Sequence, residues 1–292
     1  MNAIVVKVGG ALGVDADAVC ADVATLSGAG LPVVLVHGTS AAADALAARV
    51  GLPVRHLQSP SGHVSRYTDS ETLEIYVAAA AGQVNKSLVA ALQKLGCDAF
   101  GLSGVDGRLL LARRKDAVRA LEGGRQRVIR DDFTGQLESA NGSVLEMLLG
   151  GGYTPVVAPL ALGREGECLN VDGDRVAALI AASLHASALI LLSNVPGLLA
   201  SYPDEGSLVR HVPMAHLHTV ETLAQGRMKK KVLAARQALD AGVSTVIIGD
   251  ARRQAPIQAA LAGLGTVFGD ADVMQFECWA LPEREWAEVA AR

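Results

Sequence analysis

The chain has 292 residues, a formal net charge of −4 and a composition that is 50% hydrophobic but only 3% aromatic. This length allows one large α/β domain or two smaller ones, and a core of Ala, Val and Leu is typical of helices packed on a buried sheet. The acidic balance argues against general nucleic-acid binding. With no apolar run near the ~20 residues of a membrane span and no signal peptide, we expect a cytoplasmic protein without membrane association.

Apolar, β-branched runs alternate along the chain with amphipathic stretches, which indicates βαβ units around a mainly parallel sheet. Strands are expected at Ile4–Val8, Val33–Val36, Ala99–Leu102, Val156–Ala158, Ala188–Leu192 and Thr245–Ile248, with a short one at 208–212. Helices are expected near residues 15–29, 40–50, 70–95, 141–150, 172–185, 227–241 and 254–263. Most of these helices end in a glycine that would serve as a C-cap. Segment 108–130 is predicted to be a strand pair or hairpin around Gly123-Gly124.

Two features lie outside this pattern. Four isolated cysteines show no metal-like spacing and are expected to be thiols, without a disulfide or a structural metal; they are Cys20, Cys97, Cys168 and Cys278. Residues 271–292, with Trp279 and Trp286, follow the last strand signal and form an appendix to which the sequence assigns no role.

The first motif that could perform chemistry is Lys7-Val8-Gly9-Gly10, at the end of the first strand. Glycines let backbone N–H groups approach phosphate oxygens closely, and the helix that follows adds a favourable dipole. An ordinary tight βα turn would have the same sequence, so this motif alone does not decide the function.

A second loop of small residues, Gly38-Thr39-Ser40, follows His37 at the end of the next strand. Two such loops at neighbouring strand ends would face one crevice, where open α/β sheets bind ligands. We interpret His37 as a packing residue rather than a base, because a carboxylate nucleophile is already ionised at neutral pH.

Polar residues cluster at the start of the predicted helix 172–185. Asp172 would cap this helix, whereas Asn170 and Asp174 could orient lysines and a donor amide around a phosphoryl group. Ser193 and Asn194 follow a strongly apolar strand and could form a loop on the nucleotide side.

Three lysines, Lys229 to Lys231, lie at the beginning of the predicted helix 227–241. Cations at a helix N-terminus are unfavourable to the helix dipole, so this run suggests an anionic partner. The alternative is a solvated run of charges.

In this order the segments resemble the amino-acid kinase family, and within it the acetylglutamate kinase branch, over about residues 3–268. The resemblance implies a single domain, a three-layer αβα sandwich with a mainly parallel central sheet. An N-terminal acceptor lobe (about 1–165) and a C-terminal ATP lobe (about 166–270) would make up this domain. It also implies a homodimer, ATP as co-substrate and Mg²⁺ carried with ATP, with no metal held by the protein itself.

On the phosphate side, the resemblance implies that Lys7 and Lys231 bind the ATP phosphates and that Asp174 organises both lysines. Gly9 and Gly10 match the glycines that contact the phosphates through their backbone N–H groups.

On the acceptor side, the resemblance implies that Arg66 holds the α-carboxylate, for which a bidentate guanidinium is suited, and that Asn170 supplies an amide. Gly38 and Thr39 would also contact the acceptor. The family reads His-Gly-Gly here, so a β-carbon at Thr39 requires a negative φ if the backbone is to approach the substrate.

Several segments are more similar to one sub-branch, the kinases that act on α-aminoadipate attached to a small amino-group carrier protein in lysine biosynthesis. These segments are Ser65-Arg66-Tyr67-Thr68-Asp69, Gly101 to Gly107, Ser193 to Leu199 and Gly226 to Lys231. The implied reaction gives an acyl phosphate, and carrier-linked glutamate for arginine biosynthesis is a second possible acceptor.

Segment 108–130 contains eight basic residues and only two acidic ones, a net charge of +6 in a chain of −4. If the substrate is tethered to an acidic carrier, a basic hairpin near the acceptor pocket would steer and hold that carrier. A solvated hairpin balanced by acids elsewhere is the alternative. RNA binding is disfavoured because the segment has no aromatic residue for base stacking.

The sequence therefore predicts an ATP-dependent phosphotransferase that acts on the side-chain carboxylate of carrier-linked α-aminoadipate. N-acetylglutamate kinase of arginine biosynthesis is the alternative enzyme. A non-catalytic nucleotide or amino-acid sensor with the same fold is the alternative of a different class.

Overall fold

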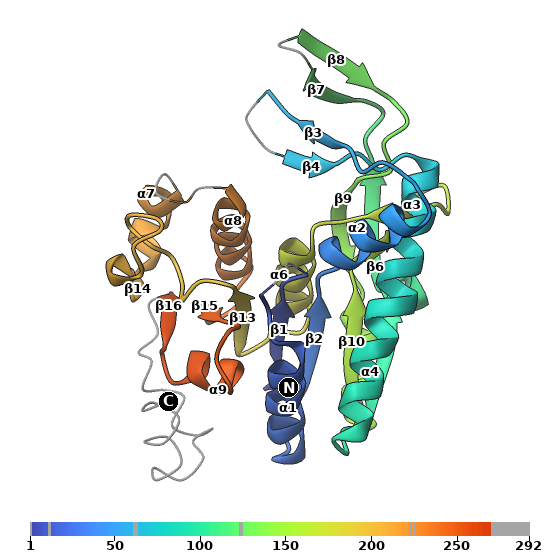
Figure 1. The fold of residues 1–292 in the computed structure, drawn as a ribbon. Coiled ribbons are helices and arrows are strands. Elements are labelled where there is room, and N and C mark those ends of the chain that lie inside the picture. The colour runs from blue at the N-terminus through green and yellow to red at the C-terminus, as the bar shows by residue number, and fades with distance from the viewer. Residues whose placement is uncertain are drawn as a thin grey trace.

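A computed structural model describes residues 2–10, 13–60, 64–122, 125–221, 224 and 226–269. Its centre is an eight-stranded sheet in which all neighbouring strands are parallel except β15 and β16 (Figure 1). From edge to edge the strands are β14 (His211–Val212), β16 (Gly265–Phe268), β15 (Thr245–Asp250), β13 (Ala188–Ser193), β1 (Ile4–Val8), β2 (Val33–His37), β10 (Thr154–Ala158) and β5 (Ala99–Ser103). The six strands predicted with confidence from β-branched runs are all present, and the mainly parallel sheet is confirmed.

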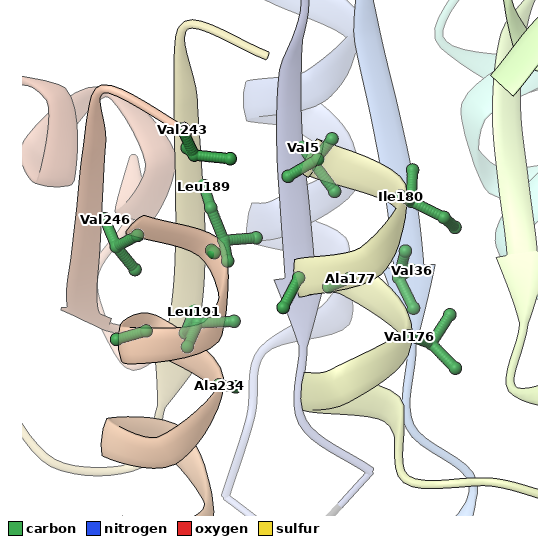
Figure 2. Close-up of a cluster of buried hydrophobic side chains, with 14 of the residues drawn as sticks. Val5, Val36, Val176, Ala177, Ile180, Leu189, Leu191, Ala234, Val243 and Val246 are labelled. Carbon is green, nitrogen blue, oxygen red and sulfur yellow. The ribbon is translucent and has the colours of Figure 1, made fainter. Parts of the chain in front are cut away.

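Helices cover both faces of this sheet, which confirms the three-layer sandwich. One face packs on α1 (Ala16–Gly28), α4 (Asn85–Lys94) and α9 (Pro256–Leu261), and the other on α5 (Gly142–Gly150), α6 (Gly173–Ser183) and α8 (Gly226–Asp240). Strand side chains alternate between the layers: Val5 packs in the α6–α8 layer, whereas Ile4 and Val6 pack in the α1–α4–α9 layer. Figure 2 shows Val5 and Leu189 facing the α6–α8 side.

The order of the strands also follows the order of the chain. β1, β2, β10 and β5 all come from the first 165 residues, whereas β13, β15, β16 and β14 come from the part after 166. The two sets meet where β1 pairs with β13, in a register from Ile4↔Ala188 to Lys7↔Leu191. The junction of the two expected lobes therefore lies along β1, beside Lys7.

The expected helix 70–95 is one continuous helical stretch with a π-helical turn in the middle. It consists of α3 (Ser70–Val77), the π-helical segment η1 (Ala78–Val84) and α4. By length and composition alone, Ser70–Lys94 is apolar enough to cross a membrane, which the sequence analysis did not expect. In the fold, Leu88 and Leu92 on this stretch pack into the core with α1 and the sheet.

Two small sheets lie beyond the carboxyl ends of the central strands. One has the order β12 (Cys168–Asn170), β11 (Leu160–Leu162), β6 (Leu110–Arg114) and β9 (Gly135–Ala140). The other, which we call the outer sheet, has the order β4 (Val64–Arg66), β3 (His56–Gln58), β7 (Val118–Glu122) and β8 (Arg125–Ile129). In Figure 1 the outer sheet stands away from the central sheet.

The prediction for segment 108–130 is right in one part and wrong in another. β7 and β8 form the expected antiparallel hairpin, from Val118↔Ile129 to Glu122↔Arg125; the intervening Gly123 and Gly124 lie outside the described residues. The leucines at 109–111 do not pair with this hairpin, because β6 pairs with β9 and β11. Leu110 and Ala112 on β6 point into the main core, which holds this strand in the other sheet.

Shorter elements complete the described chain: α2 (Ser40–Arg49), η2 (Asp106–Arg108), η3 (Glu205–Ser207), η4 (Met214–His216) and α7 (Leu217–Glu221). The strand expected at 208–212 is shorter than predicted, because β14 spans only His211–Val212 and Leu208 forms an isolated bridge with Leu199. Cys20, Cys97 and Cys168 are free thiols. Cys278, Trp279, Trp286 and the rest of 271–292 lie outside the described residues.

Candidate active site

The loops that follow β1, β2 and β13 meet at one edge of the central sheet, as the carboxyl ends of neighbouring parallel strands must. They enclose a cleft of about 260 Å³, here called the main cleft. Its lining includes every candidate site residue of the sequence analysis: Lys7, Gly9, Gly10, Gly38, Thr39, Arg66, Asn170, Asp174, Ser193, Asn194 and Lys231. Residues up to 224 positions apart in the chain thus face one cavity.

The centre of the main cleft is a carboxylate between two ammonium groups. Asp174 Oδ1 lies 2.8 Å from Lys7 Nζ and 3.0 Å from Lys231 Nζ. Lys7 shares the sheet face of Val5, which directs it toward the layer of α6 and α8. Asp174 lies in the first turn of α6 and Lys231 in the second turn of α8, and these two helices pack side by side. The fold itself therefore brings the three charges together.

The three charged side chains are almost completely buried, with 6–8% of each residue exposed. Burial alone would raise the pKa of Asp174, but the ammonium groups of Lys231 and Lys7 outweigh it and hold the pKa well below its usual range. Burial lowers the pKa of Lys231 to about 8, and the positive charge of Lys7 acts in the same direction. Two cations on one carboxylate leave a net positive charge, so the cleft favours an anion.

The backbones of the β1 and β2 loops touch at Gly10 and Gly38. A β-carbon on either glycine would overlap the backbone of the other loop. Two hydrogen bonds fix the contact, from Gly38 N–H to Val8 O (2.8 Å) and from Ala41 N–H to Gly10 O (2.9 Å). At Gly9, in contrast, a β-carbon would meet nothing closer than 3.8 Å. Glycine at positions 10 and 38 is therefore required by packing as well as by any ligand.

Thr39 takes the conformation that its β-carbon requires, with φ −133° and ψ −8° at the N-terminus of α2. Its residue is 2% exposed, and its hydroxyl oxygen is buried without a hydrogen bond of ordinary geometry. That hydroxyl interacts with the phenol of Tyr76, whose pKa burial raises to about 12. The Thr39 side chain therefore does not obstruct the backbone of the loop, and it offers a polar atom toward the main cleft.

Arg66 and Asn170 lie on the side of the cleft formed by the small sheets. Arg66 Nη2 lies 2.6 Å from Asp44 Oδ1 and donates to the carbonyl of Ser40 (3.2 Å) at the start of α2. Asn170 Nδ2 donates to Thr68 Oγ1 at 3.0 Å, which fixes the amide at the end of β12. Both side chains are held in place without occupying the cavity.

The two interpretations of Asp172 are compatible. Its Oδ1 accepts hydrogen bonds from the N–H groups of Asp174 and Arg175, so it caps α6 as predicted. Its Oδ2 lies 3.3 Å from Lys230 Nζ. The lysine run at the start of α8 is therefore divided: Lys230 and Lys231 are paired with carboxylates, and Lys229 is exposed to solvent.

His37 behaves as the packing residue that the sequence analysis expected. It is 1% exposed, and its Nε2 lies 3.3 Å from Asn85 Nδ2, which also donates to the carbonyl of Val156. Burial lowers the pKa of His37 to about 4, so the ring is neutral at physiological pH.

Several lining residues were not singled out from the sequence. Tyr76 on α3 and Thr134 before β9 face the main cleft together with Ser65. Tyr76 stands in an Ala-rich helical stretch without a motif, and Thr134 reaches the cleft only because it forms a bridge with Asn170. Such positions depend on contacts between distant segments, and a local pattern cannot identify them.

The basic segment lies mainly around a separate hollow of about 620 Å³, here called the hairpin hollow. Arg127 and Arg130 line it, together with Arg55, Arg114 and the rings of Tyr67 and Phe133. Arg114 stacks 3.6 Å above the ring of Phe133 and donates to the carbonyls of Asp132 and Arg130. The sequence was right that these cations gather on one surface.

A doubly covered parallel sheet with two lysines on one carboxylate at its strand ends is typical of proteins that bind and transfer phosphoryl groups. Comparison with known families is more specific, since the amino acid kinase family matches residues 2–250. The chain belongs to the amino acid kinase family.

Two curated relatives carry the same name, LysW-aminoadipate kinase. The protein from Deinococcus radiodurans is 52% identical over 267 residues, which covers 91% of this chain and 91% of that protein. The protein from Thermus thermophilus is 52% identical over 266 residues, covering 90% and 99%. A relative from Cenarchaeum symbiosum, named for both LysW-aminoadipate and LysW-glutamate, is 42% identical and covers 82% and 89%.

Solved structures share the fold at low sequence identity. The crystal structure of smu.665 from Streptococcus mutans superposes with a TM-score of 0.72 at 22% identity, covering 92% of this chain and 99% of that one. This likeness establishes the fold and nothing beyond it. The predicted kinase family and αβα architecture are thus both confirmed.

Proposed function

We propose that this protein transfers the γ-phosphoryl group of ATP to the side-chain carboxylate of α-aminoadipate that is linked through its amino group to a carrier protein. The product is an acyl phosphate, which a reductase would consume in lysine biosynthesis. The observation that carries the proposal is the Lys7–Asp174–Lys231 cluster beside the glycine loop, in a cleft that also presents Arg66 and Asn170. The names of the two relatives at 52% identity support the choice of acceptor.

Phosphoryl transfer to a carboxylate requires positioning and charge stabilisation rather than a base. Lys7 and Lys231 bind the phosphate oxygens, and the backbone of Gly9 and Gly10 approaches them from the β1 loop. Asp174 keeps the two ammonium groups at the correct separation and does not take up a proton. When ATP arrives, its phosphates supply the anion that the buried pair of lysines lacks.

Mg²⁺ enters this scheme with the nucleotide. Among the described residues no cluster of three or more His, Cys, Asp or Glu side chains could hold a metal ion, and Asp174 already neutralises two lysines. The ion would shield the phosphate charges during transfer. On the protein side, the lysines and glycine loop remain the groups that hold the phosphates.

The two sets of strands would divide the work. The part before residue 165, with Gly38, Thr39 and Arg66, would form the acceptor lobe, with Asn170 from β12 beside it. The part from 166 to 270 would form the ATP lobe, with Ser193 and Asn194 on the nucleotide side. This division agrees with the junction of the sheet along β1 and β13.

The carrier is proposed to be acidic and to dock on the basic surface around the hairpin hollow, where Arg127 and Arg130 are exposed. A homodimer is proposed through the β5 edge of the sheet. Phe100 and Tyr153 are 45% and 46% exposed there, with their ring centroids 6.0 Å apart. A biosynthetic role of this kind places the protein in the cytoplasm.

The test is an acyl-phosphate trapping assay with hydroxylamine, in which three acceptors are compared: carrier-linked aminoadipate, carrier-linked glutamate and N-acetylglutamate. We expect the highest kcat/KM with carrier-linked aminoadipate. Turnover of N-acetylglutamate alone would refute the carrier assignment, and turnover of none would favour a sensor.

Carrier-linked glutamate is a second candidate acceptor, because the relative from Cenarchaeum symbiosum is named for both substrates. The two acceptors differ by one methylene group, which is worth only about 1–3 kcal/mol in a pocket. One enzyme could therefore serve lysine and arginine biosynthesis, and the same assay measures the preference.

A further inference from the structure

A second cleft opens beside the main cleft, between the β3–β4 hairpin, the start of α2 and the start of α8. It has a volume of about 380 Å³ and is here called the side cleft. Five residues line both clefts: Ser40, Ser65, Arg66, Arg227 and Lys230. The side cleft therefore continues the acceptor end of the main cleft toward solvent.

The cations of the side cleft fall into two groups. Arg66 is paired with Asp44, and Lys230 with Asp172. Arg227 and Lys229 are exposed, and neither has a hydrogen bond or ion pair within the described part of the chain. Both stand in the first turn of α8, where the helix dipole disfavours positive charge. An anionic partner is the simplest physical reason for two unpaired cations at this position.

The unpaired cations are separable from the phosphate site. Lys229 and His56 line the side cleft but not the main cleft, whereas Lys231 lines the main cleft but not the side cleft. A nucleotide held by Lys7 and Lys231 would leave Lys229 free for another anion.

The hairpin hollow does not offer an equivalent route. It shares no lining residue with the main cleft. Tyr67 and Phe133 face the hollow, and their sequence neighbours Arg66 and Thr134 face the main cleft, so the same two segments of backbone form a wall between the cavities. A carrier that docks at the hollow would still need another opening for its substrate.

A tethered acceptor imposes a geometric requirement that a free amino acid does not. The chain that links aminoadipate to its carrier must pass through an opening while the phosphoryl group is transferred. We infer that the side cleft is this passage, with Lys229 and Arg227 pairing with carboxylates of the carrier segment next to the attachment point. This inference rests on the proposed carrier-linked substrate.

The test is a charge reversal at Lys229, whose exposed side chain is not needed for folding. Lys229→Glu should raise KM for carrier-linked aminoadipate about tenfold at low ionic strength, with the increase on KM rather than on kcat or on KM for ATP. The increase should shrink at high salt, because screening weakens exposed charge pairs. The matched control is Lys94→Glu, an exposed lysine at the end of α4 that lines none of the three cavities.

A steric variant tests the same passage without a change of charge. Val64 is 52% exposed and lines the side cleft but not the main cleft. Val64→Trp should lower kcat/KM for carrier-linked aminoadipate several-fold while leaving the nucleotide affinity of the protein unchanged.

Equal KM values in Lys229→Glu and Lys94→Glu, with an active wild-type enzyme, would overturn the passage and leave the proposed function intact. If the wild-type protein does not turn over carrier-linked aminoadipate, the proposed function fails first. A rise in KM confined to Lys229→Glu supports the inference.

Discussion

The phosphate end and the acceptor end of the main cleft are built differently. At the phosphate end, Lys7, Asp174 and Lys231 are buried, paired with one another and carried by a central strand and two core helices. At the acceptor end, Arg66 comes from a strand of three residues in the outer sheet, and the neighbouring Arg227 is exposed at a helix start.

The difference separates what must be rigid from what must be specific. A phosphoryl group has the same shape and charge in every reaction of this kind, so its lysines can be fixed in the core. Acceptor recognition rests on the small sheets, whose short strands can vary without disturbing the central sheet. Variants at the two ends should therefore differ in both the size and the kind of their effects.

The largest expected effect is at the phosphate end. Lys7→Ala removes one of the two cations that stabilise charge on the transferring group, so kcat should fall by about 10²–10³-fold. The measurement is initial-rate kinetics with saturating carrier-linked acceptor, with circular dichroism as the control for folding. Full turnover by Lys7→Ala would contradict the assigned role.

Asp174→Asn should reveal the cost of two buried ammonium groups without a carboxylate. We expect the free energy of unfolding to fall by about 3 kcal/mol in the absence of nucleotide, because an uncompensated buried charge remains. ATP should restore part of this loss by supplying negative charge. Chemical denaturation with and without ATP measures both effects, and Asp240→Asn, at an exposed position at the end of α8, is the control.

The lowered pKa of Lys231 makes the phosphate end sensitive to alkaline pH. Without nucleotide, the ammonium loses its proton as the pH rises through about 8. Phosphates favour the charged form, so ATP binding should take up a proton above that pH, and KM for ATP should rise about tenfold between about pH 7 and pH 9. Calorimetry in two buffers of different ionisation enthalpy measures the proton.

Lys231→Arg provides the contrast, because a guanidinium does not titrate in this range. In that variant KM for ATP should lose its alkaline rise, whatever its absolute value. A rise that persists in Lys231→Arg would assign the titration to another group.

Arg66→Lys tests the acceptor end. The lysine keeps the charge but loses the bidentate geometry that suits a carboxylate, so KM for the carrier-linked acceptor should rise about tenfold. KM for ATP should stay the same, since Arg66 is positioned by Asp44 and Ser40 rather than by the lysine cluster. A shift in both KM values would show that the two ends are not separable in the way their construction indicates.

Thr39→Gly should have the smallest effect, a decrease in kcat/KM for the acceptor of less than about fivefold. The substitution removes one buried hydroxyl that has no strong partner in the protein, and such a contact contributes about 0.5–1.5 kcal/mol at most. Thr39→Ser, which keeps the hydroxyl, should behave as the wild type. Kinetics with all three proteins separates the hydroxyl from the backbone of the loop.

The central sheet could be predicted from the sequence because its strands are buried on both sides and read as continuous apolar runs. Val33–Val36 and Ala188–Leu192 are examples, and both are central strands. The small sheets could not be predicted in the same way. Strands such as Leu160–Leu162 and His56–Gln58 have three residues each, too few for a pattern. The partner of β6 likewise depends on a distant segment.

For the candidate site, the sequence was informative where several motifs had to agree and uninformative where a single side chain arrives from elsewhere. Lys7, Asp174 and Lys231 were placed together by resemblance, and the structure brings them within 3.0 Å of one carboxylate oxygen. Asp44 carried no signal, because its position opposite Arg66 follows from the packing of α2 against the outer sheet. The two cavities beside the main cleft could not be anticipated from composition.

The contact between Gly10 and Gly38 has a consequence for how the two substrates influence each other. Because the backbones of the two loops touch, a displacement of the ATP-side loop must be transmitted to the loop that precedes the acceptor site. Binding at one side is then thermodynamically linked to binding at the other, and the linkage is reciprocal. The affinity for the acceptor should depend on whether nucleotide is bound, and the affinity for nucleotide should change by the same factor when the acceptor binds.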